Sequence, residues 1–200
     1  MMNASVSSST SPRLTPIDRP DSWYMRLVYA VLRWTMGHVL TPVKVIGARV
    51  PGYVDIARKM NATEAALSLS ADLRFLVKRY VATLNGCSFC MDVADARAHE
   101  QNVPADVRET LMRYQRGDDV APPLQAVLTY VEEATQTVTV SDATFDALRD
   151  HFRDRAIAEI TWLTAMENYY NRVTRPLNIG SDGLCPVDVR TAKKASVYAE

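Results

Sequence analysis

The feature that most constrains the fold is a helix break within residues 81–99 that is followed at once by two cysteines. Upstream of the break, apolar residues recur at the three- and four-residue spacing of one helix face, namely Leu73, Leu76, Val77, Tyr80, Val81 and Leu84. Asn85 and Gly86 are the residue types that most readily take the left-handed conformation that ends a helix. The sequence therefore predicts that Cys87 and Cys90 begin a second helix.

This Cys-x-x-Cys spacing is typical of a redox site. Two side chains three residues apart on a helix share a face, within the reach that a disulfide needs. A thiol in a first helical turn also lies near the positive end of the helix dipole and near unpaired backbone N–H groups, which favours the thiolate. From the residues alone, we expect Cys87 and Cys90 to form a reversible disulfide.

Two other interpretations of the cysteine pair are open. Cysteines pack well in cores, so the pair could be two small buried hydrophobes. A zinc site is a second alternative, but it needs about four ligands. Only Cys185 and three histidines remain outside the pair, so we expect no metal, and we interpret Cys185 as a structural thiol.

Composition limits the class of protein. The chain has 200 residues, 48% hydrophobic and 23% charged, which suits one medium domain with a sizeable core. Lys+Arg and Asp+Glu both number 23, so no net charge favours nucleic acid or an anionic membrane as a partner. Charges interrupt residues 23–40, the most apolar segment, so we expect no membrane span. Three cysteines are too few for a secreted disulfide framework, which favours the cytoplasm.

The patterning predicts a single all-α domain over residues 21–187, after a disordered arm at residues 1–20 and before a tail at residues 188–200. Helix starts are indicated at Ser22 (or Asp21), at Ser70 and at Ser141. A short helix is expected from Thr41 through Ile46, and residues 137–140 are the only β-like run.

Three further helix boundaries are predicted. A helix from Gly52 to Met60 precedes a separate short helical segment after residues 61–63. Another helix runs from residue 104 to 113. The last, at residues 156–173, is capped by Asp154.

The run LRFLVKRYVATLNGCSFCMDVADA resembles the core of the alkyl hydroperoxidase D and carboxymuconolactone decarboxylase superfamily. Upstream, LTPVKVIGARVPGYVDIARKM is similar to the family's lead-in segment. Downstream, ITWLTAMENYYNRVTRPLNIGSDGLCP resembles the closing helix and tail of longer carboxymuconolactone-decarboxylase-like members. The resemblance covers roughly residues 36–187, and Asn-Gly-Cys-x-x-Cys is its most specific part.

The resemblance implies an all-α, alkyl-hydroperoxidase-D-like helical bundle whose protomers associate as trimers or hexamers. In the peroxidase branch, a peroxide oxidises the second cysteine, here Cys90, to a sulfenic acid. Cys87 then resolves it to a disulfide, and a dithiol donor re-reduces the pair. The decarboxylase branch lacks the cysteine pair, so its name does not describe the activity expected here.

Two positions depart from the peroxidase branch. That branch places a histidine one helical turn after the second cysteine, where this chain has Ala94. It also places a glutamate on the preceding helix, where this chain has Phe75. These groups relay protons in the family, and acid–base help of that kind is worth about 10²- to 10⁴-fold in rate.

No other residue is predicted to replace the relay. Asp92 and Asp95 point away from Cys90 on the same helix, with Asp92 toward solvent or a partner. Glu167 could reach the cysteines, but an ion pair with Arg172 or Arg175 is the expectation. The remaining polar candidates, His38, His99 and His151, are expected on the surface. The aromatic residues Trp23, Trp34, Trp162, Tyr169 and Tyr170 are expected in the core or at a subunit interface.

Three functions follow from these observations. The first is a thiol-dependent oxidoreductase with peroxidase-like activity, acting on a small peroxide or disulfide through Cys90 and Cys87. The second is an oligomeric helical binding or scaffold protein that has lost efficient chemistry. The third is a lyase on a small organic acid, using basic groups such as Arg74, Lys78 or Arg79. No Gly-rich phosphate loop, haem signature or flavin signature is present in the sequence, so no cofactor is expected.

Overall fold

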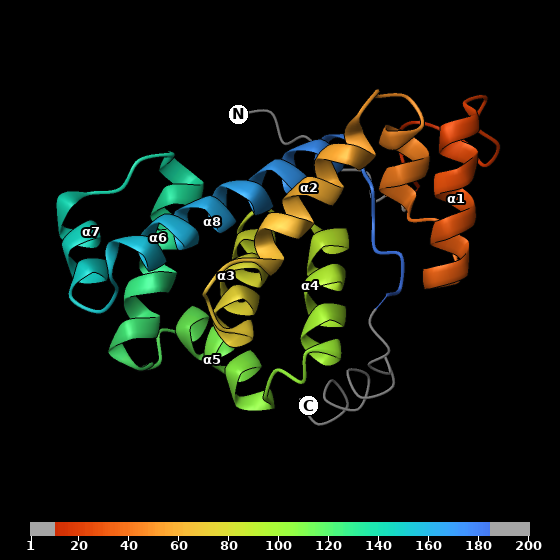
Figure 1. Cartoon of the computed structure of the whole chain (residues 1–200). Coiled ribbons are helices and arrows are strands. Elements are labelled where there is room, and N and C mark those ends of the chain that lie inside the picture. The colour runs from red at the N-terminus through yellow and green to blue at the C-terminus, as the bar shows by residue number, and fades with distance from the viewer. Residues whose placement is uncertain (1–10, 185–200) are drawn as a thin grey trace, which may run out of the picture.

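The computed structural model describes residues 11–184, and the regular structure of that part is helical, with no strand (Figure 1). Its elements in sequence order are α1 (Trp23–Met36), η1 (Val43–Gly47), α2 (Tyr53–Ala65), α3 (Ala71–Leu84), α4 (Ser88–Glu100), α5 (Ala105–Arg116), α6 (Pro122–Thr137), α7 (Asp142–Arg149), α8 (Asp154–Thr174) and η2 (Arg175–Leu177). The predicted all-α fold is confirmed. Of the predicted arm, residues 11–20 are described and lie against the domain, where the Arg13 N–H donates to the Leu177 carbonyl at 2.9 Å and the Tyr29 hydroxyl to the Ile17 carbonyl at 2.7 Å. Residues 1–10, Cys185 and the predicted tail at residues 188–200 lie outside the described residues.

Helix α3 lies at the centre of the bundle, where it packs against α4, α5, α6 and α8. Its apolar face is fully buried, with Val77 and Val81 each 0% exposed. The residues that meet this face are aliphatic and come mainly from α6 and α8: Val127, Leu128, Val131, Ile160 and Leu163. Burial of such a continuous apolar face is the main source of stability for a domain of this kind. Figure 1 shows α7 at one end of the bundle and α1 at the other.

Three predicted N-caps are confirmed, whereas the predicted Asp154 cap was wrong, because Asp154 is the first residue of α8 and Arg153 holds its N-cap position without a side-chain hydrogen bond. The side-chain oxygens of Ser22, Ser70 and Ser141 each accept a hydrogen bond from the backbone N–H three residues later, at 3.5, 3.2 and 3.3 Å. Each bond satisfies one of the N–H groups that a helix start leaves without a partner. These three helices therefore begin where the sequence alone places them.

Several predicted boundaries were wrong. Helix α2 continues through residues 61–63 to Ala65, because the Asn61 side chain accepts a hydrogen bond from Arg97 at 2.8 Å and does not cap a new helix. Helix α5 runs to Arg116, three residues beyond its predicted end. The last helix, α8, already begins at Asp154. The β-like run at residues 137–140, which is too short to imply a sheet, forms no strand: Thr137 ends α6, and Val138 follows with a φ of 69°.

The predicted short helix before α2 is present as the π-helical turn η1. It brings Gly47 against α2, where an added Cβ would lie 3.3 Å from side-chain atoms of both Tyr53 and Val54. A larger residue would push these two elements apart. Only glycine fits this contact without displacing its neighbours.

The segment after η2 returns along α4. Asp92 accepts hydrogen bonds from the Ser181 hydroxyl at 2.7 Å and from the Leu184 backbone N–H at 2.9 Å. The Asp182 carboxylate accepts a bond from the Thr41 N–H at 2.7 Å. Asp92 thus holds the protein's own C-terminal segment, which corrects the expectation that it faces solvent or a partner.

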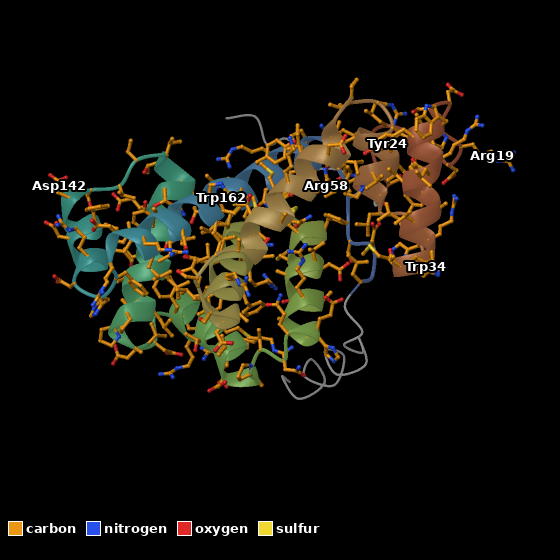
Figure 2. All side chains as sticks on the ribbon, in the orientation of Figure 1. Arg19, Tyr24, Trp34, Arg58, Asp142 and Trp162 are labelled. Carbon is orange, nitrogen blue, oxygen red and sulfur yellow. A yellow bond between two sulfur atoms is a disulfide. The ribbon has the colours of Figure 1, made fainter. Side chains whose placement is uncertain are left out.

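Helix α1 presents an apolar face to solvent. Trp23 and Trp34 are 77% and 86% exposed, and Leu27 and Val31 lie between them on the same face at 55% and 48%. Of the two predicted locations for these tryptophans, the core is therefore excluded, and a subunit interface stays a prediction. Trp34 lies at the end of α1, at the edge of the molecule (Figure 2).

Candidate redox-active site

The cysteine pair lies where the sequence predicts, at the junction of α3 and α4. Gly86 takes a φ of +61° in this junction, the left-handed conformation that favours glycine. Cys87 is the N-cap of α4, and its Sγ accepts a hydrogen bond from the Cys90 backbone N–H at 3.3 Å. The two sulfurs are joined as a disulfide. The break in the helix pattern therefore serves to hold two sulfurs on the first turn of α4.

Apolar residues surround the disulfide almost completely. Cys87 is 0% exposed and Cys90 is 4% exposed, so Cys90 is the slightly more exposed residue of the pair. Four elements, η1, α2, α3 and α4, and the segment after η2 contribute the buried members of the surrounding cluster, which are Val45, Ile46, Tyr53, Ala82, Phe89 and Ile179. A site of this kind admits a small molecule more readily than a large one.

One hydroxyl group lies against both sulfurs. The Oγ1 atom of Thr174, at the C-terminal end of α8, lies 3.2 Å from Cys87 Sγ and 3.8 Å from Cys90 Sγ. Thr174 is 1% exposed, and its hydroxyl also donates to the Tyr170 carbonyl oxygen at 2.9 Å. Sequence reasoning missed Thr174, because nothing in the local pattern of α8 shows that this end of the helix meets a residue 87 positions earlier.

The phenol of Tyr170 is a second polar group beside the cysteine cluster. Its ring packs against that cluster, and its hydroxyl is buried without a hydrogen-bond partner in residues 11–184. Burial raises the pKa of Tyr170 to about 12, so the group is a neutral O–H donor at physiological pH.

The two positions that carry the proton relay in the peroxidase branch are apolar here, as the sequence shows. Phe75 and Ala94 are 7% and 4% exposed, and both line a cavity of about 20 Å³. Four charged side chains line the same cavity, from Glu64 on α2, Arg74 and Lys78 on α3, and Arg97 on α4. The relay is absent at its usual positions, and a set of buried charges lies beside them.

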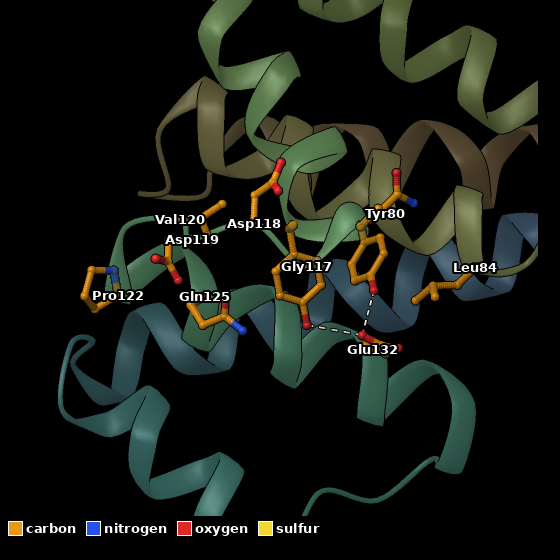
Figure 3. Close-up of a pocket in the computed structure, with 11 residues that line it drawn as sticks. Tyr80, Leu84, Gly117, Asp118, Asp119, Val120, Pro122, Gln125 and Glu132 are labelled. Atoms are coloured by element: carbon orange, nitrogen blue, oxygen red, sulfur yellow. Dashed lines mark hydrogen bonds between the residues drawn. The ribbon is translucent and has the colours of Figure 1, made fainter.

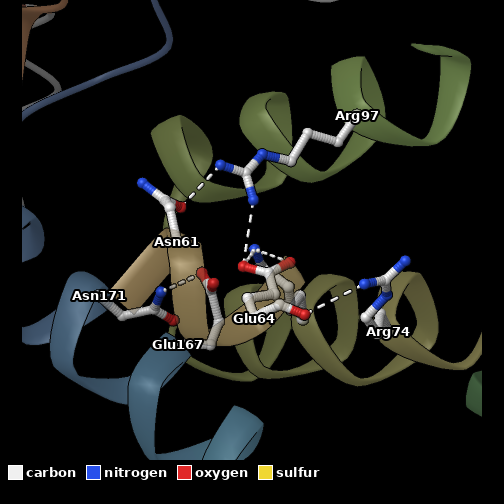
Figure 4. Close-up of polar contacts among 7 residues, drawn as sticks. Asn61, Glu64, Arg74, Arg97, Glu167 and Asn171 are labelled. Carbon is white, nitrogen blue, oxygen red and sulfur yellow. Dashed lines mark hydrogen bonds and ion pairs between the residues drawn. The ribbon is translucent and has the colours of Figure 1, made fainter. Parts of the chain in front are cut away.

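Glu64 is the one carboxylate lining this cavity, and it forms ion pairs with two of the cations (Figure 4). Lys78 Nζ donates to both carboxylate oxygens of Glu64 at 2.9 and 2.8 Å, and Arg97 donates to the same carboxylate at 3.1 Å. Although burial opposes ionisation, Lys78 and Arg97 hold the pKa of Glu64 below its ordinary value. Burial, and then the charge of Arg97, lower the pKa of Lys78.

These contacts leave little support for the lyase interpretation. Of its three suggested basic groups, Lys78 is paired with Glu64 in the interior, and Arg79 forms an ion pair with Asp95 at 3.0 Å. Arg74 donates to the Glu64 backbone carbonyl at 3.1 Å (Figure 4). The three groups do not converge on one open pocket.

Glu167 differs from its prediction. It is 4% exposed and forms no ion pair with Arg172 or Arg175, which instead donate to Asn168 and to the Asn85 carbonyl. Its carboxyl accepts a hydrogen bond from Asn171 at 2.9 Å (Figure 4). Burial raises the pKa of Glu167 to about 7.

Asn171 connects Glu167 to the loop that carries the cysteines. Its side-chain oxygen accepts a hydrogen bond from Asn85 Nδ2 at 3.0 Å. Asn85 ends α3 two residues before Cys87. A buried polar path thus runs from α8 to the start of the redox site.

A wide cleft lies away from the cysteines. It has a volume of about 820 Å³ and is lined by residues of α3, α5, α6 and the α5–α6 loop, neither cysteine being among them (Figure 3). Glu132 lies in its wall and accepts hydrogen bonds from Tyr80 at 2.7 Å and Tyr114 at 3.2 Å. These bonds pair three of the polar side chains that line the cleft with one another.

The three histidines are exposed, as predicted. Within residues 11–184, no group of three or more His, Cys, Asp or Glu side chains is placed to hold a metal ion. In the same part of the protein, no helix has both the length and the apolar character needed to span a membrane.

The fold and the cysteine pair together define an alkyl-hydroperoxidase-D-like helical protein with a dithiol site. Among solved structures, the chain is similar to an alkylhydroperoxidase AhpD core, an uncharacterised peroxidase-related protein from Ralstonia eutropha JMP134. That match has a TM-score of 0.61 and 22% identity, and it covers 80% of this chain and 87% of the other. The predicted fold class is confirmed by this likeness.

Two further proteins resemble the chain. One is the uncharacterised protein YnjA of Escherichia coli K12, 27% identical over 172 residues, which are 84% of this chain and 90% of YnjA. The other is a cysteine-to-alanine variant of the debrominase Bmp8, solved in complex with 2,3,4-tribromopyrrole. This match has a TM-score of 0.69 and 16% identity, and it covers 91% of this chain and 96% of the Bmp8 chain. No protein-family model matches the sequence.

Proposed function

We propose that this protein is a thiol-dependent oxidoreductase that reduces a small peroxide or disulfide through Cys90 and Cys87. The observation that carries the proposal is the disulfide on the first turn of α4, where the Cys90 N–H donates to Cys87 Sγ and the Thr174 hydroxyl lies within hydrogen-bond reach of the same sulfur. Buried cysteines that serve packing alone do not need a paired sulfur or a converging donor. The likeness to peroxidase-related folds supports the same interpretation.

The reaction with a peroxide proceeds in three steps. The Cys90 thiolate attacks one peroxide oxygen, so that an S–O bond forms, the O–O bond breaks and the alkoxide takes a proton to leave as an alcohol. Cys87 then attacks the Cys90 sulfenic acid, which forms the disulfide and releases water. A dithiol donor restores both thiols and is itself oxidised to a disulfide. This cycle needs a reducing compartment, and we propose the cytoplasm.

Mass spectrometry tests this function directly. In Cys87→Ser, peroxide should add one oxygen to Cys90 that persists, because the resolving thiol is missing. In Cys90→Ser, neither the oxygen nor the disulfide should form. The matched control, Cys185→Ser, should behave like the unaltered protein. The proposal fails if Cys90 gains neither oxygen nor a disulfide, or if a dithiol cannot restore the thiols.

A scaffold role is the second candidate, and one observation favours it. Phe75 and Ala94 place apolar side chains at the two relay positions, and the two cysteines are almost completely buried. This role predicts that replacing both cysteines with alanine leaves the biological function of the protein intact. Loss of function in the double alanine variant, with the fold preserved by circular dichroism, would exclude it.

We also propose that the protein is a homo-oligomer. The exposed face of α1, with Trp23, Leu27, Val31 and Trp34, is an apolar surface of the kind that subunit interfaces bury. Light scattering should give a mass several times that of one protomer. Trp34→Lys should lower that mass, because a charge at the interface costs desolvation energy. A monomeric unaltered protein would contradict the proposal.

A further inference from the structure

The environments of the two sulfurs differ. Cys87 Sγ receives the Cys90 backbone N–H at 3.3 Å and lies 3.2 Å from the Thr174 hydroxyl, whereas Cys90 Sγ lies 3.8 Å from that hydroxyl. Cys87 is 0% exposed, whereas Cys90 is 4% exposed. Cys87 Sγ therefore has the closer hydrogen-bond contacts, whereas Cys90 is the slightly more exposed residue of the pair.

The Thr174 hydroxyl can serve Cys87 in either redox state. In the disulfide state the hydroxyl donates to the Tyr170 carbonyl at 2.9 Å. A rotation about the Cβ–Oγ1 bond of Thr174 redirects the hydrogen to Cys87 Sγ, which already lies within hydrogen-bond reach. A thiolate at Cys87 would then accept two hydrogen bonds and lie at the N-terminus of α4, where negative charge is favoured.

We propose that Thr174 is a catalytic residue that makes Cys87 the leaving thiolate when the disulfide is reduced, which fixes Cys90 as the sulfur attacked by the donor. This inference rests on the proposed function. A donor thiolate attacks Cys90 Sγ, a new S–S bond joins donor and Cys90, and the Cys90–Cys87 bond breaks. The electron pair of that bond goes to Cys87, and the second thiol of the donor dithiol then releases Cys90 as a thiol and leaves the donor as a disulfide.

The chemistry of thiol–disulfide exchange explains which sulfur of the disulfide leaves. Exchange is faster when the leaving sulfur is the more stable thiolate. The contacts of Thr174 and of the Cys90 N–H both favour Cys87 as that sulfur. The same stabilisation serves the oxidative half of the cycle, because Cys87 attacks the Cys90 sulfenic acid as a thiolate.

Three variants test the role of Thr174. Thr174→Val keeps the shape and removes the hydroxyl, and Thr174→Ser keeps the hydroxyl. Thr164→Val is the matched control, because Thr164 is also buried on α8, at 3% exposure, and its hydroxyl also donates to the carbonyl four residues earlier, at 2.8 Å. All are made in a Cys185→Ser background, so that only the paired cysteines are followed.

Two measurements separate a chemical role from a structural one. Thiolate absorbance at 240 nm follows ionisation, and stopped-flow kinetics follow reduction of the disulfide by a small dithiol such as dithiothreitol. For Thr174→Val we expect the first thiolate to form about one pH unit higher and reduction to be about tenfold slower, the effect of losing one hydrogen bond to a charged sulfur. Thr174→Ser and Thr164→Val should match the unaltered protein in both measurements.

The outcomes distinguish this inference from the proposed function. If dithiothreitol reduces the unaltered protein but Thr174→Val behaves like Thr164→Val, the role of Thr174 is refuted and the proposed function stands. If dithiothreitol cannot reduce the unaltered disulfide, the proposed function fails first. Thermal unfolding of Thr174→Val and Thr164→Val to similar midpoints shows that any difference in kinetics does not come from the fold.

Discussion

The Glu167→Gln substitution should change how stability depends on pH. Glu167 is 4% exposed, and burial raises the pKa of its carboxyl from the ordinary value of 4.5 to about 7. Lys78, the Asn171 hydrogen bond and Arg97 act against this rise, whereas Glu64 adds to it. Glutamine has the same shape and keeps an oxygen for the Asn171 N–H, so the substitution removes the titration and little else.

The direction in which stability changes with pH follows from proton binding. Between pH 4.5 and about 7, the unfolded protein has lost the Glu167 proton and the folded protein still holds it. Stability therefore falls as pH rises through this window, and above it the buried carboxylate destabilises the fold. Each pH unit between the two pKa values is worth about 1.4 kcal/mol, so the full effect is about 3 kcal/mol. Between pH 4 and pH 8, the free energy of unfolding of Glu167→Gln should therefore rise by about 3 kcal/mol relative to that of the unaltered protein.

Urea unfolding, followed by circular dichroism at pH values from 4 to 8, measures this difference. Glu100→Gln is the control, because Glu100 is exposed at the end of α4 and its substitution removes the same charge from the surface. Its stability curve should run parallel to that of the unaltered protein. A Glu167→Gln curve that is also parallel would show that the carboxyl ionises freely in the folded state and would refute the reasoning.

Three further substitutions have expected effects on the free energy of unfolding in urea. Glu64→Gln leaves Lys78 buried without its counter-charge and should cost about 3–5 kcal/mol, and a loss under 1 kcal/mol would mean that water reaches the lysine. Ser70→Ala removes the N-cap of α3 and should cost about 1 kcal/mol, whereas no change would show that another group caps the helix. Leu163→Ala, in the core, should cost about 2–5 kcal/mol. If it costs no more than Leu27→Ala on the exposed face of α1, the assignment of the core is wrong.

The sequence is most informative where one short segment determines the structure. Ser22, Ser70 and Ser141 cap helices because each needs only an N–H three residues away, and the Asn85-Gly86 break places the cysteines for the same local reason. The Cys87–Cys90 disulfide joins residues three positions apart, so it too could be predicted.

Contacts between distant segments could not be predicted in this way. Thr174 reaches Cys87 across 87 positions of sequence, and Asn171 reaches Asn85 across 86. The residues of each pair meet because α8 packs along α3, and this packing depends on the whole bundle. The prediction for Glu167 failed for the same reason. Neighbouring arginines in sequence suggested an ion pair, but the packing of α8 turns the carboxyl into the interior and the arginines toward the surface.

The absence of the relay has a consequence for substrate preference. Glu64 and Lys78 lie beside Phe75 and Ala94, but they neutralise each other and neither is free to act as a base. Glu167 has a pKa of about 7, yet it reaches the redox loop only through the amide groups of Asn171 and Asn85, which do not pass protons on. Peroxide reduction needs a proton at the leaving oxygen, whereas exchange with a disulfide expels a thiolate that is stable without one.

The reduced protein should therefore react faster with a small disulfide, such as hydroxyethyl disulfide, than with tert-butyl hydroperoxide at the same concentration. Ala94→His places an acid–base group one turn after Cys90, and it should raise the peroxide rate by up to about 10²-fold while leaving the disulfide rate within about twofold. Acid quenching and mass spectrometry of the cysteine pair give both rates. A faster peroxide reaction in the unaltered protein would mean that some other group supplies the proton. The first group to test, by Tyr170→Phe, is the hydroxyl of Tyr170, because its ring packs against the cysteine cluster and the hydroxyl is buried without a hydrogen-bond partner among the described residues.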